Sequence, residues 1–147
     1  MKDRNLSKII TPGSILHDKS FQFKDGEIGN KLLIVLNEDA NYPYIIVKTT
    51  SKQKSKGRDE GFQLNDKPPN FFLPKGSCSF KLDTWAELIE FYEFDVNEIF
   101  SKKLSKTLEL KNSLPKSILK DLLDCAKSCD DITNKQAEII GETFKNL

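Results

Sequence analysis

The chain lacks the residues and segments that mark several large classes of protein. No apolar run approaches the roughly 18 residues that a membrane-spanning helix requires, and the longest spans residues 32–36. The three cysteines include no Cys-x-x-Cys pair and are too few for a disulfide framework, so we expect a reducing, cytoplasmic location without membrane association. The sequence contains no phosphate-binding glycine loop and no dinucleotide fingerprint. Most enzyme classes with a recognisable signature are therefore excluded.

Histidine is present only once, as His17. A single histidine excludes metal sites built from two histidines and makes a Ser-His-Asp triad difficult to assemble, so we predict no metal site. His17 itself can serve as an acid or a base, or it can be a structural residue near a strand. Cys125 and Cys129 lie four residues apart in a predicted helix and can share a metal, but packing is the simpler explanation because no further ligands are evident.

Arginine is almost absent, and the charge is unevenly distributed along the chain. The 147 residues carry 23 basic and 22 acidic side chains, for a net charge of +1, and the only arginines are Arg4 and Arg58. The net charge is +5 over residues 1–58, −6 over residues 59–100 and +2 over residues 101–147. A chain polarised in this way can attract a polyanion to one side, although scattered solubilising charge is the alternative.

The first two thirds of the sequence have the pattern of β-strands. Residues 31–37 form a continuous apolar run with polar ends, which is typical of a strand buried on both faces. Residues 44–50 are β-branched almost throughout, so the two segments predict an antiparallel pair across a polar loop. Upstream, Phe21 and Phe23 alternate with polar residues until the turn dipeptide Asp25-Gly26.

The last third of the sequence has the pattern of two helices. Ser113 followed by Pro115 predicts the start of the first helix. Thr133 with Gln136 predicts a capping box at the start of the second, since the two side chains can satisfy each other's backbone N–H groups.

Length and element order together predict one domain of α+β class, mainly β, over residues 1–147. The β-structure occupies about residues 11–112, and the helices occupy the remainder, about 113–147. Residues 84–94 are ambiguous in this prediction. Thr84 with Glu87 fits a helix-capping box, whereas the density of aromatic side chains suits a strand.

Several segments resemble the PemK/MazF family of toxin endoribonucleases, over roughly residues 11–128. Residues 12–15, Pro-Gly-Ser-Ile, match the family's opening strand, and Thr50-Ser51 matches the Thr-Ser pair that ends a later strand. Lys31 stands where the family has an arginine in a glycine-led strand, and the proline that follows that arginine is absent here. The segment from Asp83 also resembles a strand of the family, which favours β-structure over residues 84–94.

The resemblance implies a small SH3-like β-barrel with peripheral helices, a homodimer that acts on single-stranded RNA and is held inactive by an antitoxin protein. It also implies cleavage without metal or cofactor, by in-line attack of the ribose 2′-OH. Lys31 and Thr50 correspond to the family's catalytic arginine and threonine. On that basis Lys31 would exchange protons and counter phosphate charge, and Thr50 would hold a phosphoryl oxygen. We expect both side chains to face one cleft from neighbouring strands.

A lysine-rich stretch follows the second of the two predicted core strands. Residues 51–61 contain no apolar side chain and predict a surface loop. By the resemblance this loop lies near an RNA channel, where its basic residues can contact phosphates, although an ordinary solvated loop is the alternative. The predicted RNA-binding residues are Lys48, Ser51, Lys52, Lys54, Lys56 and Arg58.

Two other functions remain open at this point. The missing family arginine favours a catalytically inactive barrel that binds RNA or protein. The acidic residues 59–100 suit an immunity or antitoxin-like interaction module that binds a basic partner. For a homodimer, Phe62, Phe71 and Phe72 are candidate interface residues, and their burial within the protomer is the alternative.

Overall fold

The computed structural model describes residues 10–23, 25–38, 42–52, 61–63, 70–76 and 80–147, and over these residues the chain forms one antiparallel sheet with three helices. The strands are β1 (Ser14–Gln22), β2 (Ile28–Val35), β3 (Tyr44–Thr50), β4 (Gly61–Gln63), β5 (Asn70–Leu73), β6 (Thr84–Glu87), β7 (Tyr92–Phe94) and β8 (Leu108–Ser113). The helices are α2 (Val96–Leu104), α3 (Lys116–Ala126) and α4 (Asn134–Lys145). The α+β class, mainly β, is therefore confirmed.

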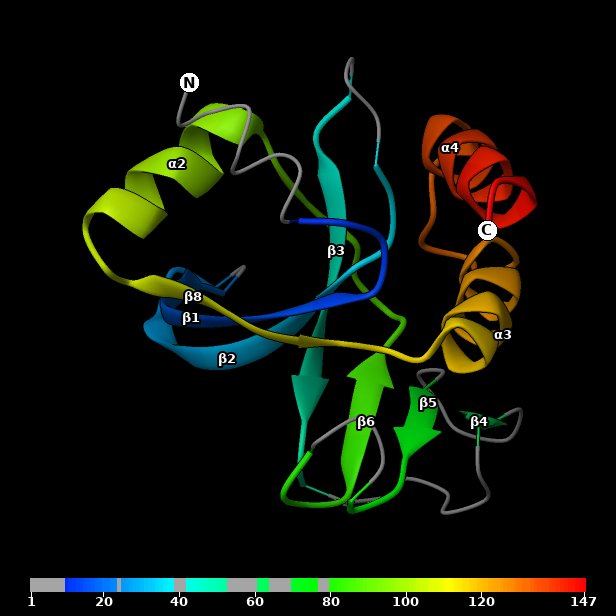
Figure 1. Cartoon of the computed structure of the whole chain (residues 1–147), viewed down its shortest axis with the longest axis horizontal. Coiled ribbons are helices and arrows are strands. Elements are labelled where there is room, and N and C mark those ends of the chain that lie inside the picture. The colour runs from blue at the N-terminus through cyan, green and yellow to red at the C-terminus, as the bar shows by residue number, and fades with distance from the viewer. Residues whose placement is uncertain (1–9, 24, 39–41, 53–60, 64–69, 77–79) are drawn as a thin grey trace.

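The sheet is open and does not close into a barrel among the described strands. Its order is β4-β5-β6-β3-β2-β1-β8, and the two end strands do not pair with each other. β3 is shared: its first residues pair with β7 and its last with β6, while β2 lies along its other edge. Figure 1 shows that β1, β2 and β8 consequently cross β3, β5 and β6 at a steep angle. The expected closed barrel is not formed because α3 follows β8 directly and packs beside β4.

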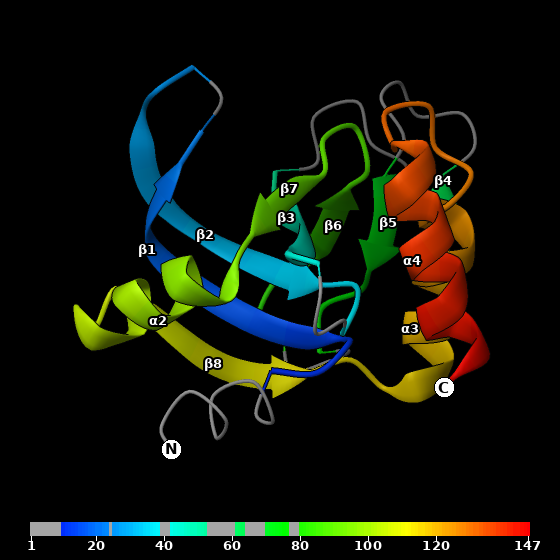
Figure 2. The same cartoon turned by 90° about the horizontal axis from the view of Figure 1, so that it is seen from above.

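Two separate apolar clusters lie on the two faces of the sheet, because successive residues of a strand point to opposite faces. In β2, Ile34 joins the cluster covered by α3 and α4, whereas Leu33 and Val35 join the cluster that includes Ile99 of α2. Figure 2 shows α3 and α4 side by side at one end of the sheet, well separated from α2. The prediction that residues 31–37 contain a strand buried on both faces is confirmed.

The sequence contains two capping-box patterns, and only one of them begins a helix. At the start of α4, the Thr133 hydroxyl accepts from the Gln136 backbone N–H, and the Gln136 side chain accepts from the Thr133 N–H, both at 3.0 Å. That prediction is confirmed. For residues 84–94 the sequence left a helix and a strand open and the family resemblance favoured a strand. The strand is confirmed at residues 84–87, which form β6 between β3 and β5. Consecutive buried residues, such as Trp85 and its neighbours on both sides, suit an interior strand and leave no solvent face for a surface helix.

Helix α2 lies between β7 and β8 and was not predicted. It begins after Asp95, whose carboxylate accepts a hydrogen bond from the Glu98 backbone N–H at 2.7 Å. Of the nine residues in this fully described helix, Ile99 alone is buried. The sequence does carry a signal for this helix that our prediction did not use. The apolar residues that fall at helical spacing are Val96, Ile99, Phe100 and Leu104.

Two of the predicted dimer-interface residues belong to the protomer's own interior. Phe71 and Phe72 are 3% and 4% exposed, so they are not available to a second copy. Phe72 packs against Trp85, with the ring centroids 4.9 Å apart. The side chain of Phe62 lies outside the described residues. Of the two alternatives that the sequence left open, burial within the protomer is therefore confirmed for Phe71 and Phe72, because strand β5 is covered on both faces.

The remaining sequence-based expectations concern cysteines, metals and membranes. Cys129 is buried and Cys125 is half-buried, both are free, and burial raises the pKa of each thiol to about 11. The described residues contain no group of three or more His, Cys, Asp or Glu side chains able to hold a metal ion. None of the helices in this part of the chain is long and apolar enough to cross a membrane.

The tyrosines provide a test of how the elements are packed. Tyr42 donates to Glu93 at 2.6 Å, and this bond raises its pKa from 10.0 to about 12, while burial raises the pKa values of Tyr44 and Tyr92. Because the folded state holds these protons more tightly, the Tyr42 contribution to stability is complete below pH 10 and is lost as the pH rises through about 12. Absorbance titration should show less tyrosinate in the folded protein near pH 10 than in the denatured chain. The denatured chain is the reference for this titration. If the tyrosines of the folded protein ionised over the same pH range as those of the denatured chain, the Tyr42–Glu93 bond and the burial of Tyr44 and Tyr92 would be contradicted.

Candidate functional site

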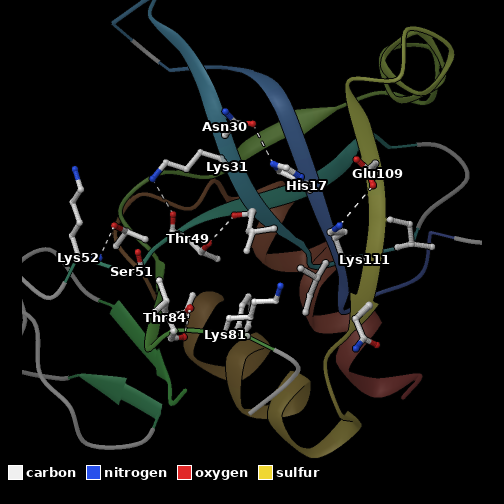
Figure 3. Close-up of a pocket in the computed structure, with 17 residues that line it drawn as sticks. His17, Asn30, Lys31, Thr49, Ser51, Lys52, Lys81, Thr84, Glu109 and Lys111 are labelled. Carbon is white, nitrogen blue, oxygen red and sulfur yellow. Dashed lines mark hydrogen bonds and ion pairs between the residues drawn. The ribbon is translucent and has the colours of Figure 1, made fainter. Parts of the chain in front are cut away.

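A cavity of about 780 Å³ opens on the sheet where β1, β2, β3 and β8 meet residues 80–84. Figure 3 shows His17 and Lys31 on one side of it, Lys81 and Thr84 on the opposite side, and Glu109 and Lys111 at one end. Its volume lies within the range of small-molecule binding sites. The cavity therefore has room for a ligand of nucleotide size.

The floor of the cavity is apolar because one face of the sheet supplies it. His17 of β1 is paired with Leu32 of β2 and with Glu109 of β8, and directly paired residues in an antiparallel sheet share a face. Ile15 and Phe80 add buried apolar surface. Thr49 joins β2 to β3 at this level, since its hydroxyl donates to the Leu32 carbonyl at 2.8 Å.

The structure brings Lys31 and Thr50 to the lining of the same cavity. The pairing of β2 with β3 ends at Leu33 and Lys48, and Lys31 and Thr50 each lie two residues beyond that pair on the two neighbouring strands. The Lys31 ammonium donates to the Thr49 carbonyl oxygen at 3.1 Å and lies 5.7 Å from the ring centre of Phe23. These contacts hold the charge of Lys31 at the β3 edge of the cavity.

Of the predicted RNA-binding residues that the structure describes, two line the cavity and one does not. Ser51 and Lys52 line the cavity and are exposed, and the backbone N–H of Lys52 donates to the Thr50 hydroxyl at 3.2 Å. Lys48 lies elsewhere: its side chain is only 12% exposed, and its ammonium is 3.5 Å from Glu90 and 3.9 Å from Glu87. Lys54, Lys56 and Arg58 lie outside the described residues.

Two lysines and a glutamate of the cavity were missed by the sequence analysis. Lys81 precedes β6, and Glu109 and Lys111 belong to β8, so no local pattern links them to Lys31. The lysines that line the cavity are Lys31, Lys52, Lys81 and Lys111. Glu109 is the one carboxylate among the described lining residues, so the cavity carries a net positive charge.

Glu109 is kept ionised by its neighbours. Lys19 hydrogen-bonds to it at 2.8 Å, and Lys111 lies 3.7 Å from its other oxygen. The hydrogen bond and charge of Lys19, helped by Lys111 and His17, lower the pKa of Glu109 below its usual value. A fixed negative charge therefore lies at the β8 end of an otherwise positive cavity.

His17 lies between the two ends, and its ring is fixed by a neighbour. Its Nε2 is 3.2 Å from the side-chain oxygen of Asn30. The sequence left the role of this histidine open, and the structure places it on the lining of the cavity.

Comparison of the chain with protein-family models, curated proteins and solved structures found no match. The resemblance to the PemK/MazF family therefore rests on the residues quoted for it, and function must be argued from the geometry of this cavity.

Proposed function

We propose that this protein binds single-stranded RNA in the cavity and cleaves it, as a toxin-like endoribonuclease of the PemK/MazF kind. The observation that carries the proposal is a net-positive cavity built around the Lys31 and Thr50 pair. An SH3-like ancestry for the open sheet, a homodimer and an antitoxin partner belong to the same proposal.

The cavity has the division of polarity that a nucleotide requires. Its apolar floor, with Leu32 and Phe80, suits the face of a base, and the lysines around it suit phosphate groups. Leu82 also lines the cavity and is 59% exposed, which offers further apolar surface for an unstacked base.

The residues present can support transesterification of RNA. In that reaction the ribose 2′-oxygen forms a bond to phosphorus, the bond to the 5′-oxygen breaks, and the products are a 2′,3′-cyclic phosphate and a 5′-hydroxyl. The Lys31 ammonium would offset the charge that develops on the phosphoryl oxygens and protonate the leaving 5′-oxygen. The Thr50 hydroxyl, which accepts one hydrogen bond from Lys52, keeps its own proton to donate to a phosphoryl oxygen.

The positive lining predicts how RNA binding depends on salt. Replacing Lys52, Lys81 and Lys111 together with glutamine should weaken the binding of single-stranded oligonucleotides of any sequence, because phosphate contacts carry no sequence information. The slope of log affinity against log salt should become shallower by roughly 2 units, at about 0.7 per lost contact. Fluorescence anisotropy at several salt concentrations measures both quantities.

A matched variant separates the cavity from net charge. Lys116, Lys135 and Lys145 are exposed on α3 and α4 and do not line the cavity, so their replacement by glutamine removes the same charge elsewhere. This control should bind RNA nearly as the parent does. Equal weakening by both triple variants, or no RNA binding by the parent at low salt, would contradict the proposal.

An RNA-binding protein without cleavage is the second candidate, and one contact favours it. The Lys31 ammonium already donates to the Thr49 carbonyl, so it must share or exchange that bond to reach a phosphate. End-group analysis of RNA incubated with the protein distinguishes the two functions, because only cleavage yields new 5′-hydroxyl ends. The interaction module has less support, since the carboxylates of Glu87, Glu90 and Glu93 hold partners within the chain.

A further inference from the structure

We propose that His17 is the general base of the RNA cleavage reaction, taking the proton from the attacking ribose 2′-hydroxyl. This inference rests on the proposed function and assigns a role to a residue that the family resemblance leaves without one. It also separates the base from the acid, because His17 belongs to β1 and the ammonium of Lys31 is held at the Thr49 carbonyl of β3.

The position of His17 within the sheet supports this role. His17 and Leu32 are direct partners in β1 and β2, and Leu32 is joined to Thr49 through the hydroxyl-to-carbonyl bond. The ammonium of Lys31 is held at the Thr49 carbonyl of β3, whereas the imidazole of His17 belongs to β1, and Figure 3 shows the two groups apart on the same side of the cavity. Neighbouring strands are about 4.8 Å apart, so two strand spacings leave room for one phosphodiester between the two groups.

The partner of His17 selects the form of the ring that a base requires. A side-chain carbonyl oxygen can only accept, so the bond from Nε2 to the Asn30 oxygen requires the proton on Nε2. Nδ1 of the neutral ring then keeps its lone pair and can accept a proton. Asn30 is therefore the positioning residue for the base.

The charges around His17 suit the form it takes after proton transfer. Glu109 is the direct partner of His17 on β8, and its low pKa keeps it negative beside the ring. An imidazolium formed during the reaction would be stabilised by this carboxylate, while Lys19 and Lys111 bind the same carboxylate from its other sides.

The proton balance of the step is complete with the groups present. His17 Nδ1 removes the proton of the 2′-hydroxyl as the 2′-oxygen bonds to phosphorus, and Lys31 gives a proton to the departing 5′-oxygen. The enzyme is left with an imidazolium and a neutral amine, and solvent restores both before the next turnover. No oxidant, reductant or co-reactant is required.

The test compares cleavage with binding in His17→Gln. The glutamine amide nitrogen can still donate to Asn30, but the side chain has no basic atom. We expect the single-turnover cleavage rate to fall by about a hundredfold or more, as for a lost proton-transfer group. Binding of a 2′-O-methyl oligonucleotide, which has no 2′-proton to lose, should stay within about twofold of the parent.

Chemical rescue distinguishes a base from a structural residue. In His17→Gly the space left by the ring can admit imidazole, and added imidazole should restore cleavage in proportion to its concentration. Lys116→Gln, which alters an exposed residue of α3 that does not line the cavity, should cleave nearly as the parent. Parent-like cleavage by His17→Gln, or the absence of rescue in His17→Gly, would overturn the role of His17 alone. A parent protein that cleaves no RNA would overturn the proposed function and this role with it.

Discussion

Replacing Lys102 with methionine should destabilise the protein by about 3 kcal/mol, because it leaves a buried carboxylate without its cation. Asp18 is fully buried in β1, and Lys102 of α2 donates to it at 2.9 Å while lying 5.3 Å from the ring centre of Phe94. The other oxygen of Asp18 accepts from the Ser20 backbone N–H at 3.0 Å. Urea unfolding followed by circular dichroism measures the change.

The chain supplies its own control for this prediction. Lys19 and Glu109 form an ion pair of nearly the same length, 2.8 Å, but both side chains are close to half exposed. Lys19→Met should leave the free energy of unfolding nearly unchanged, because solvated pairs contribute little. Combining Asp18→Val with Lys102→Met should cost less than Lys102→Met alone, since no unpaired charge remains. Equal losses in the free energy of unfolding for Lys102→Met and Lys19→Met would contradict the prediction. They would show that the burial of Asp18 does not make its ion pair more stabilising than a solvated one.

Lys31→Ala should reduce RNA cleavage by about a hundredfold or more, with only a modest loss of RNA binding. The ammonium is one of four in the cavity, so the others maintain most of the attraction for phosphate. Its contact with the Thr49 carbonyl is not reproduced by any other described lining lysine, so its contribution to the reaction should be lost outright. Single-turnover cleavage and anisotropy on a 2′-O-methyl oligonucleotide give the two values.

Lys31→Arg and Lys116→Ala are the companion variants. Arginine keeps the charge, adds a planar fork for phosphate oxygens and restores the residue that the PemK/MazF family has at this position, so its cleavage should equal or exceed that of the parent. Lys116 is exposed on α3 outside the cavity, and its loss should change neither value. Cleavage by Lys31→Ala at the parent rate would remove Lys31 from the mechanism.

The parts of the fold that were predictable are those encoded by neighbouring residues. The continuous apolar run of β2 and the β-branched run of β3 show directly that both faces are buried, and the Thr133 capping box is a local bond. The same local pattern at Thr84 left a helix and a strand open, and tertiary packing of Trp85 between β3 and β5 outweighed a weak capping preference. The open edge of the sheet depends on where α3 packs, which no local pattern records.

The candidate site was predictable only where it lies on adjacent strands. Lys31 and Thr50 end two runs that pair with each other, so their proximity follows from the register. Lys81 and Glu109 reach the cavity from segments far away in the sequence. The role proposed for His17 depends on its hydrogen bond to Asn30 on the neighbouring strand of the hairpin, which the sequence does not show. Lys48 resembled the loop lysines in sequence, but its position in the interior of β3 directs it to Glu87 and Glu90.

The pairing of β1 with β8 affects the order in which parts of the chain can fold during synthesis. β1 is the first strand to be synthesised and β8 the last, and every pairing between them joins residues far apart in the sequence. Contacts of such long range close slowly, since the intervening chain must first be ordered. A nascent chain therefore carries His17 long before Glu109 and Lys111 arrive beside it, so the cavity can form only after residues 108–113 have been synthesised.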